Sequence, residues 1–152
     1  MDARIDPAKA LGLTEGDAHV IRNAGGRASE ALRSVIISQQ LLGTQEVVVI
    51  HHVRFTPYTY LFTRNKTNLL DPLLTSQTDC GMLTFTDADI RSKIRKDLGE
   101  NVDHLSFLPF GDLQQSVKDD VTLLKKSPLV ADVPVSGYVY DVTSGRIDPV
   151  TV

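Results

Sequence analysis

The feature that most constrains the fold of this chain is a run of four β-branched residues, Val47 to Ile50, followed directly by His51 and His52. Apolar and polar side chains do not alternate along the run, and this pattern predicts a strand that is buried on both faces. Strands of this kind belong to parallel sheets, in which helices cover the faces and ligands bind near the carboxyl ends of the strands. The run therefore predicts an α/β protein with the two histidines at the ligand-binding edge of its sheet.

Periodicity elsewhere in the chain supports the α/β class. Apolar residues at helical spacing, with capping residues and glycine stops, predict three helices and one further helical turn. They are expected at Ser29–Leu42, Asp87–Leu98, Asp112–Lys126 and within Pro7–Leu13. Apolar runs predict two more strands and a terminal hairpin, at His19–Ile21, Leu105–Phe110 and Val135–Val142 with Ile147–Val152. The first two strands in chain order and the helix between them would form a right-handed βαβ unit.

Composition excludes several classes of protein. A chain of 152 residues forms one domain and holds a core without disulfides or a structural metal. Its net charge of −3 lacks the basic surface of a nucleic-acid-binding protein, and its one cysteine, Cys80, forms no disulfide within the chain. We find no apolar segment of signal-peptide or membrane-spanning length. The default expectation is a cytoplasmic protein, with a lost N-terminal targeting segment as the alternative.

Two groups of residues have side chains that suit a metal or catalytic site. Asp2 and Arg4 are two positions apart and so lie on one face of a strand, where the guanidinium would keep the carboxylate ionised and oriented. His51, His52 and Cys80 are of types that bind zinc. The alternatives are a solvated charged terminus for the first group, and a core histidine with an inert buried thiol for the second.

A glycine-rich turn at Arg22-Asn23-Ala24-Gly25-Gly26 is the third candidate. Glycines let a backbone approach a small ligand closely, although a plain strand-to-helix turn explains the same residues. The turn matches neither the dinucleotide-binding nor the P-loop pattern, so a nucleotide-binding domain is disfavoured.

Read together, these motifs resemble those of the β-class carbonic anhydrases, in particular the small, short-chain members. The matching segments are Met1–Arg4, Arg22–Gly26, Ser38–Thr44, Val49–His52, Thr78–Met82, Ser127–Leu129 and Gly137–Asp141. The resemblance covers residues 1–52 and 78–152, which are 127 of the 152 residues. It implies one domain over residues 1–152, with a mostly parallel central sheet of four strands, flanking helices and a C-terminal edge hairpin.

The resemblance also implies an activity, a cofactor and residue roles. The activity is the reversible hydration of carbon dioxide to bicarbonate, and the cofactor is Zn²⁺. His52 and Cys80 would bind the metal, and Asp2 would orient the reacting water while Arg4 holds Asp2 away from the metal. Asn23, Ala24, Gly25 and Gly81 would line the substrate pocket, and His51 would be structural. The family implies a homodimer or a higher homo-oligomer, with no nucleic acid or membrane as partner.

The chain departs from the family pattern at two places. The family's first zinc cysteine would precede Met1, which leaves Asp2 as a substitute third ligand and predicts weak zinc binding with little activity. Residues 53–77, 25 residues in all, separate His52 from Thr78, where the family has His-Thr-Asp-Cys without interruption. An intron translated in frame explains this segment, since Val53 and Gln77 permit GT and AG at its ends, and Met1 would then be an internal methionine. A genuine insertion that loops out is the alternative.

Two other functions remain open at this point. The chain could be a non-catalytic relative that kept the scaffold, which the absent cysteine favours and the retained Asp2, Arg4, His52 and Cys80 oppose. It could also be a hydrolase of CS2 or COS on the same scaffold, because the zinc residues of such an enzyme would look alike.

Overall fold

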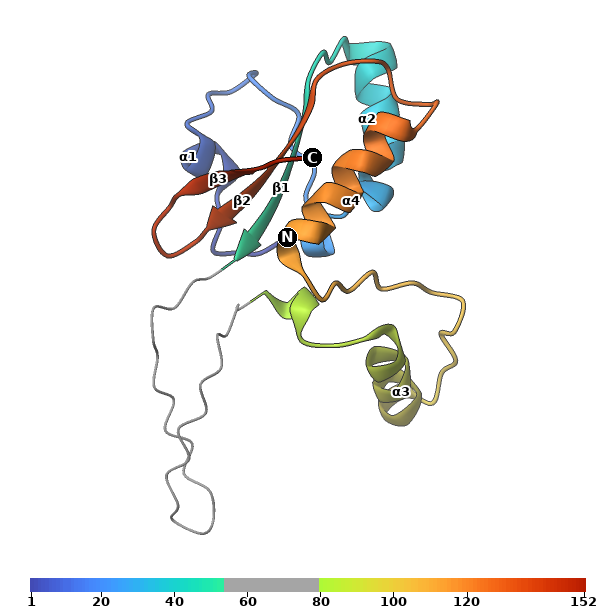
Figure 1. The fold of residues 1–152 in the computed structure, drawn as a ribbon. Coiled ribbons are helices and arrows are strands. Elements are labelled where there is room, and N and C mark those ends of the chain that lie inside the picture. The colour runs from blue at the N-terminus through green and yellow to red at the C-terminus, as the bar shows by residue number, and fades with distance from the viewer. Residues whose placement is uncertain (54–79) are drawn as a thin grey trace.

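The computed structural model describes residues 1–53 and 80–152 (Figure 1). Its helices are α1 (Pro7–Leu11), α2 (Ala28–Leu42), α3 (Asp87–Leu98) and α4 (Leu113–Lys126), and two 3₁₀ turns are η1 (Ala24–Gly26) and η2 (Gly81–Leu83). Its strands are β1 (Val47–Val53), β2 (Val135–Asp141) and β3 (Ile147–Val150). None of the helices in the described ranges is long and apolar enough to cross a membrane.

The three strands form one mixed sheet in the order β1-β2-β3. β1 and β2 are parallel, with Val47 opposite Val135 and His52 opposite Tyr140. β2 and β3 are antiparallel and form the predicted C-terminal hairpin. The predicted α/β class is confirmed, and the parallel connection runs from β1 to β2 through α3 and α4 rather than through the predicted unit that starts at residue 19.

Two predicted strands are wrong, and the described residues contain three strands, whereas the resemblance implied four in the central sheet. Residues 19–21 and 105–110 are irregular. Val20 and Leu105 are 52% and 44% exposed, so these short apolar runs lack the burial that stabilises a strand. Leu108 has a φ of 57°, which lies outside the extended region that a strand requires.

The predicted helices are confirmed, and their ends follow from local capping. α2 ends where Gly43 adopts the left-handed conformation, at a φ of 73°. Thr86 and Asp89 form a reciprocal capping box at the start of α3. The Asp112 side chain accepts a hydrogen bond from the Gln115 amide at the start of α4.

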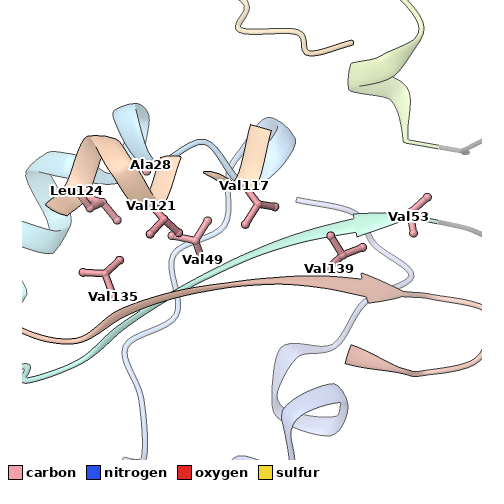
Figure 2. Close-up of a cluster of buried hydrophobic side chains, with 8 residues drawn as sticks. All are labelled: Ala28, Val49, Val53, Val117, Val121, Leu124, Val135 and Val139. Atoms are coloured by element: carbon pink, nitrogen blue, oxygen red, sulfur yellow. The ribbon is translucent and has the colours of Figure 1, made fainter. Parts of the chain in front are cut away.

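The core lies between the sheet and α4, and α2 packs against α4 on the same side of the sheet (Figure 1). Figure 2 shows the buried side chains of this core: Ala28, Val49, Val53, Val117, Val121, Leu124, Val135 and Val139. Gly137 lets α4 approach β2 closely, because a Cβ there would lie 2.5 Å from Cγ1 of Val117. The register of this helix on the sheet therefore depends on a position without a side chain.

β1 is buried on one face only, which corrects the prediction of two buried faces. Val49, His51 and Val53 point toward α4 and are buried, whereas Val48 on the other face is 48% exposed. Val53 belongs to β1 and pairs with Asp141. The rest of the predicted 53–77 insertion, with Thr78, lies outside the described residues.

Candidate functional site

Asp2 and Arg4 form a tight ion pair next to the sheet. Nε of Arg4 lies 3.0 and 3.1 Å from the two carboxylate oxygens of Asp2, and the Arg4 amide donates to Oδ1 at 2.9 Å. These hydrogen bonds from Arg4 hold the pKa of the Asp2 carboxyl well below its usual range, against the opposing effect of burial. Asp2 is therefore an ionised carboxylate with a set direction. Residues 3–4 form a turn, so the predicted strand at this pair is wrong, and the turn brings the Arg4 amide to the Asp2 carboxylate.

Backbone contacts place this pair beside the glycine turn. The N-terminal amine of Met1 donates to the Asn23 carbonyl at 2.8 Å, and Nη2 of Arg22 donates to the Asp2 carbonyl at 2.5 Å. The first four residues thus lie along residues 22–23, which come directly before η1. The sequence suggested the two motifs separately, and the structure brings them together.

His52 lies near the carboxyl end of β1 and faces Asp2. Its Nε2 is 3.7 Å from Oδ2 of Asp2, and its Nδ1 is buried without a hydrogen-bond partner among the described residues. Burial lowers the pKa of His52, which outweighs the opposing effect of the Asp2 charge. The ring is therefore neutral at neutral pH, and the neutral imidazole is the form that binds a metal ion.

Cys80 and Gly81 lie at the start of η2, the turn that packs against η1. Cys80 is 3% exposed and begins the segment that leads into η2. η2 packs against η1: a Cβ on Gly25 would lie 3.1 Å from Cγ of Met82 and 3.2 Å from Cε1 of Phe110. The close contact explains why the turn has a glycine at this position.

A groove of about 940 Å³ contains part of the predicted site. Asp2, Asn23, Gly25 and His52 are among the residues that line it, and the groove extends along the open face of β1. Ala24, Cys80 and Gly81 are outside this lining. The structure thus gathers the predicted carboxylate, imidazole and turn in one concave surface.

The donor set of this site is smaller than that of a catalytic zinc centre. Such centres use three protein ligands and keep one position open. Among the residues that the structure describes, no three His, Cys, Asp or Glu side chains lie together so that they could hold a metal ion. His52 and Cys80 are of the right donor types, but the Asp2 carboxylate is engaged by Arg4. The described residues therefore fit only part of a zinc site.

Sequence reasoning missed a buried polar cluster behind β1. His51 contacts Ser116 and Asp120 of α4, and Arg27 contacts the same two residues. Ser116 and Asp120 are four positions apart, so they lie on one face of a predicted helix that is otherwise apolar there. Two polar residues on that face were a usable signal in the sequence.

The chain is similar to known proteins over nearly all its length. It is 35% identical to the β-carbonic anhydrase 1 of Mycobacterium tuberculosis over 155 positions, covering 99% of this chain and 78% of the relative. It is 30% identical to a carbon disulfide hydrolase of Saccharolobus solfataricus over 173 positions, covering 97% of this chain and 72% of that enzyme.

Structural similarity agrees with the sequence similarity, although no protein-family model matches the chain. The solved structure of a carbonic anhydrase from Streptococcus mutans has a TM-score of 0.79 at 42% identity, covering 99% of this chain and 77% of that one. Identity at this level over most of a relative's length, together with the shared fold, confirms the resemblance seen in the motifs. The chain belongs to the β-carbonic anhydrase family.

Proposed function

We propose that the site of this chain is that of a zinc-dependent carbonate dehydratase, which converts carbon dioxide and water to bicarbonate and a proton. The observation that carries the proposal is the Asp2–Arg4 pair facing His52 beside a glycine turn, with Oδ2 of Asp2 3.7 Å from Nε2 of His52. Family membership supports the reaction, since two of the relatives described above are named carbonic anhydrases.

Each residue has a separate task in this proposal. We assign His52 and Cys80 as metal donors among the residues that the structure describes. Asp2 accepts a hydrogen bond from the reacting water, and Arg4 fixes the direction in which the carboxylate points. Asn23 and Gly25, which line the groove, contact carbon dioxide in this proposal, and Ala24 and Gly81 complete the pocket from positions outside the groove lining. Zinc, when bound, lowers the pKa of a water ligand to about 7, which is the chemistry that hydration at neutral pH requires.

We further propose that the polypeptide of these 152 residues binds zinc weakly and has low activity. The described residues bring no three metal donors together, and Asp2 cannot serve both as a third donor and as the group that orients water. Residues 1–152 would form one domain, with residues 53–77 as an insertion whose origin, intron or loop, a full-length transcript would decide.

The test measures zinc content and carbon dioxide hydration of the full chain, alone and as His52→Ala and Asp2→Asn variants. We expect zinc well below one per chain and slow hydration, with a further loss of zinc in His52→Ala. Asp2→Asn should lower hydration while zinc content is unchanged, because Asn keeps the shape of the side chain but not its charge. Stoichiometric zinc with fast hydration in the unaltered chain would contradict the proposed impairment.

A redesigned variant separates an impaired enzyme from a scaffold without activity. It adds a cysteine before Met1 and deletes residues 53–77, which joins His52 to Thr78. A gain of zinc and of hydration supports an enzyme that lacks donors, and no gain supports the non-catalytic alternative. The same protein, assayed for sulfide release from CS2 and COS, tests the hydrolase alternative that the carbon disulfide hydrolase relative favours.

We propose a second copy of this chain as the partner, in a homodimer or a higher homo-oligomer. Val20, Ile21 and Val48 line the groove and are 52%, 44% and 48% exposed. A concave apolar surface of this kind on a small domain is typical of a protein interface. Sedimentation velocity should show at least a dimer, and Val48→Asp should shift it toward the monomer.

A further inference from the structure

His51 is held on both ring nitrogens by one helix. Its Nε2 is 3.1 Å from Oδ2 of Asp120, and its Nδ1 is 3.1 Å from Oγ of Ser116. Ser116 and Asp120 are one turn apart on α4, and all three side chains are 1–2% exposed. Successive side chains of a strand point to opposite faces, so His51 and His52 point to opposite faces of β1. α4 therefore contacts His51 on the face of β1 that is opposite the proposed site.

Arg27 connects this pair of contacts to the glycine turn. Its Nη1 donates to Oγ of Ser116 at 2.9 Å, and its Nη2 is 3.2 Å from Oδ1 of Asp120. Arg27 directly follows η1, and its carbonyl accepts a hydrogen bond from Nδ2 of Asn23 at 2.8 Å. One guanidinium therefore joins the residue that ends the turn to the helix that holds β1.

Phe110 closes the cluster with its aromatic face. Its ring stacks on the His51 ring with centroids 5.4 Å apart, and the Arg27 guanidinium lies 5.8 Å from the centroid of the same ring. His51, Ser116 and Asp120 are thus enclosed by protein, and Arg27, whose side chain is 15% exposed, pairs its charge with Asp120. We call Arg27, His51, Ser116 and Asp120 the cluster.

Hydrogen-bond accounting assigns the protons of the cluster. Arg27 has only donors, so Oγ of Ser116 accepts from it, and the Ser116 hydroxyl keeps its own hydrogen to donate to Nδ1 of His51. Nε2 of His51 then carries the ring proton and donates to the carboxylate of Asp120. The geometry therefore places a proton on Nε2 of His51, directed at the Asp120 carboxylate.

A nucleophilic role for these residues fails on access. Ser116, His51 and Asp120 have the composition of a hydrolytic triad, in which histidine takes the serine proton as substrate is attacked. Ser116 is 2% exposed and already bonds both Arg27 and His51, so no substrate carbonyl can reach its oxygen. His51, Ser116 and Asp120 are enclosed, and any effect that the cluster has on the site acts through the backbone.

We propose that Arg27, Ser116 and Asp120 are positioning residues that act through His51, holding the end of β1 and the turn at residues 23–26 in one fixed relation. The inference rests on the proposed function in one respect, that His52 and the turn belong to the same site. Gly26 lies close against β1: a Cβ there would lie 3.0 Å from Cδ2 of His51 and 3.0 Å from the Ile50 carbonyl. A shift of His51 would therefore move both His52 and the turn.

Burial of charge supports positioning rather than stability as the role of the cluster. Apolar residues of similar volume often match or exceed the stability of a buried ion pair, so such a pair is weak evidence for stability. Hydrogen bonds to both ring nitrogens of His51, in contrast, select one arrangement of β1 and α4, although Nε of Arg27 has no hydrogen-bond partner among the described residues.

The test uses the metal-free full chain, so that it does not depend on zinc or on activity. Asp120→Asn keeps the shape of the side chain but leaves Arg27 unbalanced, and Ser116→Ala is a milder second variant. Leu124→Ala is the matched control, because Leu124 lies one turn further along α4, is 2% exposed and is outside the cluster. Denaturant is added to the more stable proteins, so that the unaltered chain and the three variants are compared at the same free energy of unfolding.

Two readouts are expected to separate the variants from the control. In the unaltered chain and in Leu124→Ala, the ¹⁵N shifts of His51 should show one tautomer, protonated on Nε2. In Ser116→Ala and Asp120→Asn, the same shifts should show a mixture of tautomers. At matched stability, amide hydrogen exchange in peptides covering residues 22–28 and 49–53 should be about tenfold faster in Asp120→Asn than in Leu124→Ala, with equal rates in residues 135–150. Equal exchange in all peptides, or a mixed tautomer in the unaltered chain, would overturn the inference.

Cobalt binding tests the link to the metal separately. If the unaltered chain binds Co²⁺, Asp120→Asn should weaken that affinity about 10-fold or more, as changes outside the ligand shell do elsewhere, while Leu124→Ala should not. If it binds no Co²⁺, the proposed metal site fails, and the tautomer and exchange measurements still decide whether the cluster positions β1 and the turn.

Discussion

Asp2 and His52 face each other across the site, with Oδ2 of the carboxylate 3.7 Å from Nε2 of the imidazole. The carboxylate is closer to Arg4 than to His52, since Nε of Arg4 lies 3.0 and 3.1 Å from its oxygens. Arg4 therefore determines where the negative charge points, and the His52 ring keeps a nitrogen available.

Removal of the Arg4 guanidinium should release the Asp2 carboxylate. In Arg4→Gln the pKa of Asp2 should rise toward the ordinary carboxyl value, because the hydrogen bonds from Arg4 are the largest cause of its lowering. A ¹³C NMR titration of the Asp2 carboxyl measures the change. Arg146→Gln is the control, since it breaks the exposed Arg146–Asp148 pair and should leave the Asp2 titration as it was.

Burial of His52 should make stability depend on pH. The folded chain binds the His52 proton less readily than the unfolded chain, because burial lowers the pKa from 6.5. The free energy of unfolding should therefore fall as pH drops from 6.5 toward the lowered pKa, and His52 should add no slope above 6.5. Urea unfolding across this interval should show a smaller slope in His52→Gln. His104→Gln, at an exposed histidine, should keep the slope, and a slope unchanged in both variants would contradict the prediction.

A side chain at Gly137 should push α4 away from the sheet. A Cβ in Gly137→Ala would lie 2.5 Å from Cγ1 of Val117 and 3.0 Å from Cγ2 of Val121, so the helix must move. Overpacking of a core costs about 1–3 kcal/mol, and urea unfolding should show a loss of this size. Gly111→Ala has open space around its new Cβ and should unfold at nearly the unaltered midpoint.

The contact between Gly26 and His51 can be separated from backbone strain. Gly26 and Gly43 have left-handed φ values of 68° and 73°, so alanine at either position costs about 1–2 kcal/mol in strain. Of these two glycines, only Gly26 has atoms close to the added Cβ: His51 and Ile50 each lie 3.0 Å from it. A Cβ at Gly43 would have nothing within 4 Å. Gly26→Ala should therefore lower the free energy of unfolding more than Gly43→Ala, as urea unfolding would measure. Equal losses in the free energy of unfolding would mean that the close approach of Gly26 to His51 does not matter for stability.

Local sequence signals predicted the parts of this fold that depend on neighbours along the chain. The Thr86 cap of α3, the glycine at 43 that ends α2 and the C-terminal hairpin are in the structure where the sequence placed them. The pairing of Asp2 with Arg4 is also local, although a turn at residues 3–4 brings the two side chains together and not the strand that the sequence predicted. The predictions of strands at 19–21 and 105–110 were wrong, because a short apolar run forms a strand only where it can pair with a neighbouring strand and bury its side chains.

The sequence by itself determined the helices, their caps, the hairpin and the family, since each depends on residue types at short or ordered spacing. Only the tertiary structure decided that Asp2 faces His52, 50 positions away, and that His51 contacts Asp120, 69 positions away. It also decided that β1 is buried on one face and open on the other. The physical reason is that spacing along a chain sets contacts within one helix or strand, whereas contacts between distant elements depend on how the sheet and α4 pack.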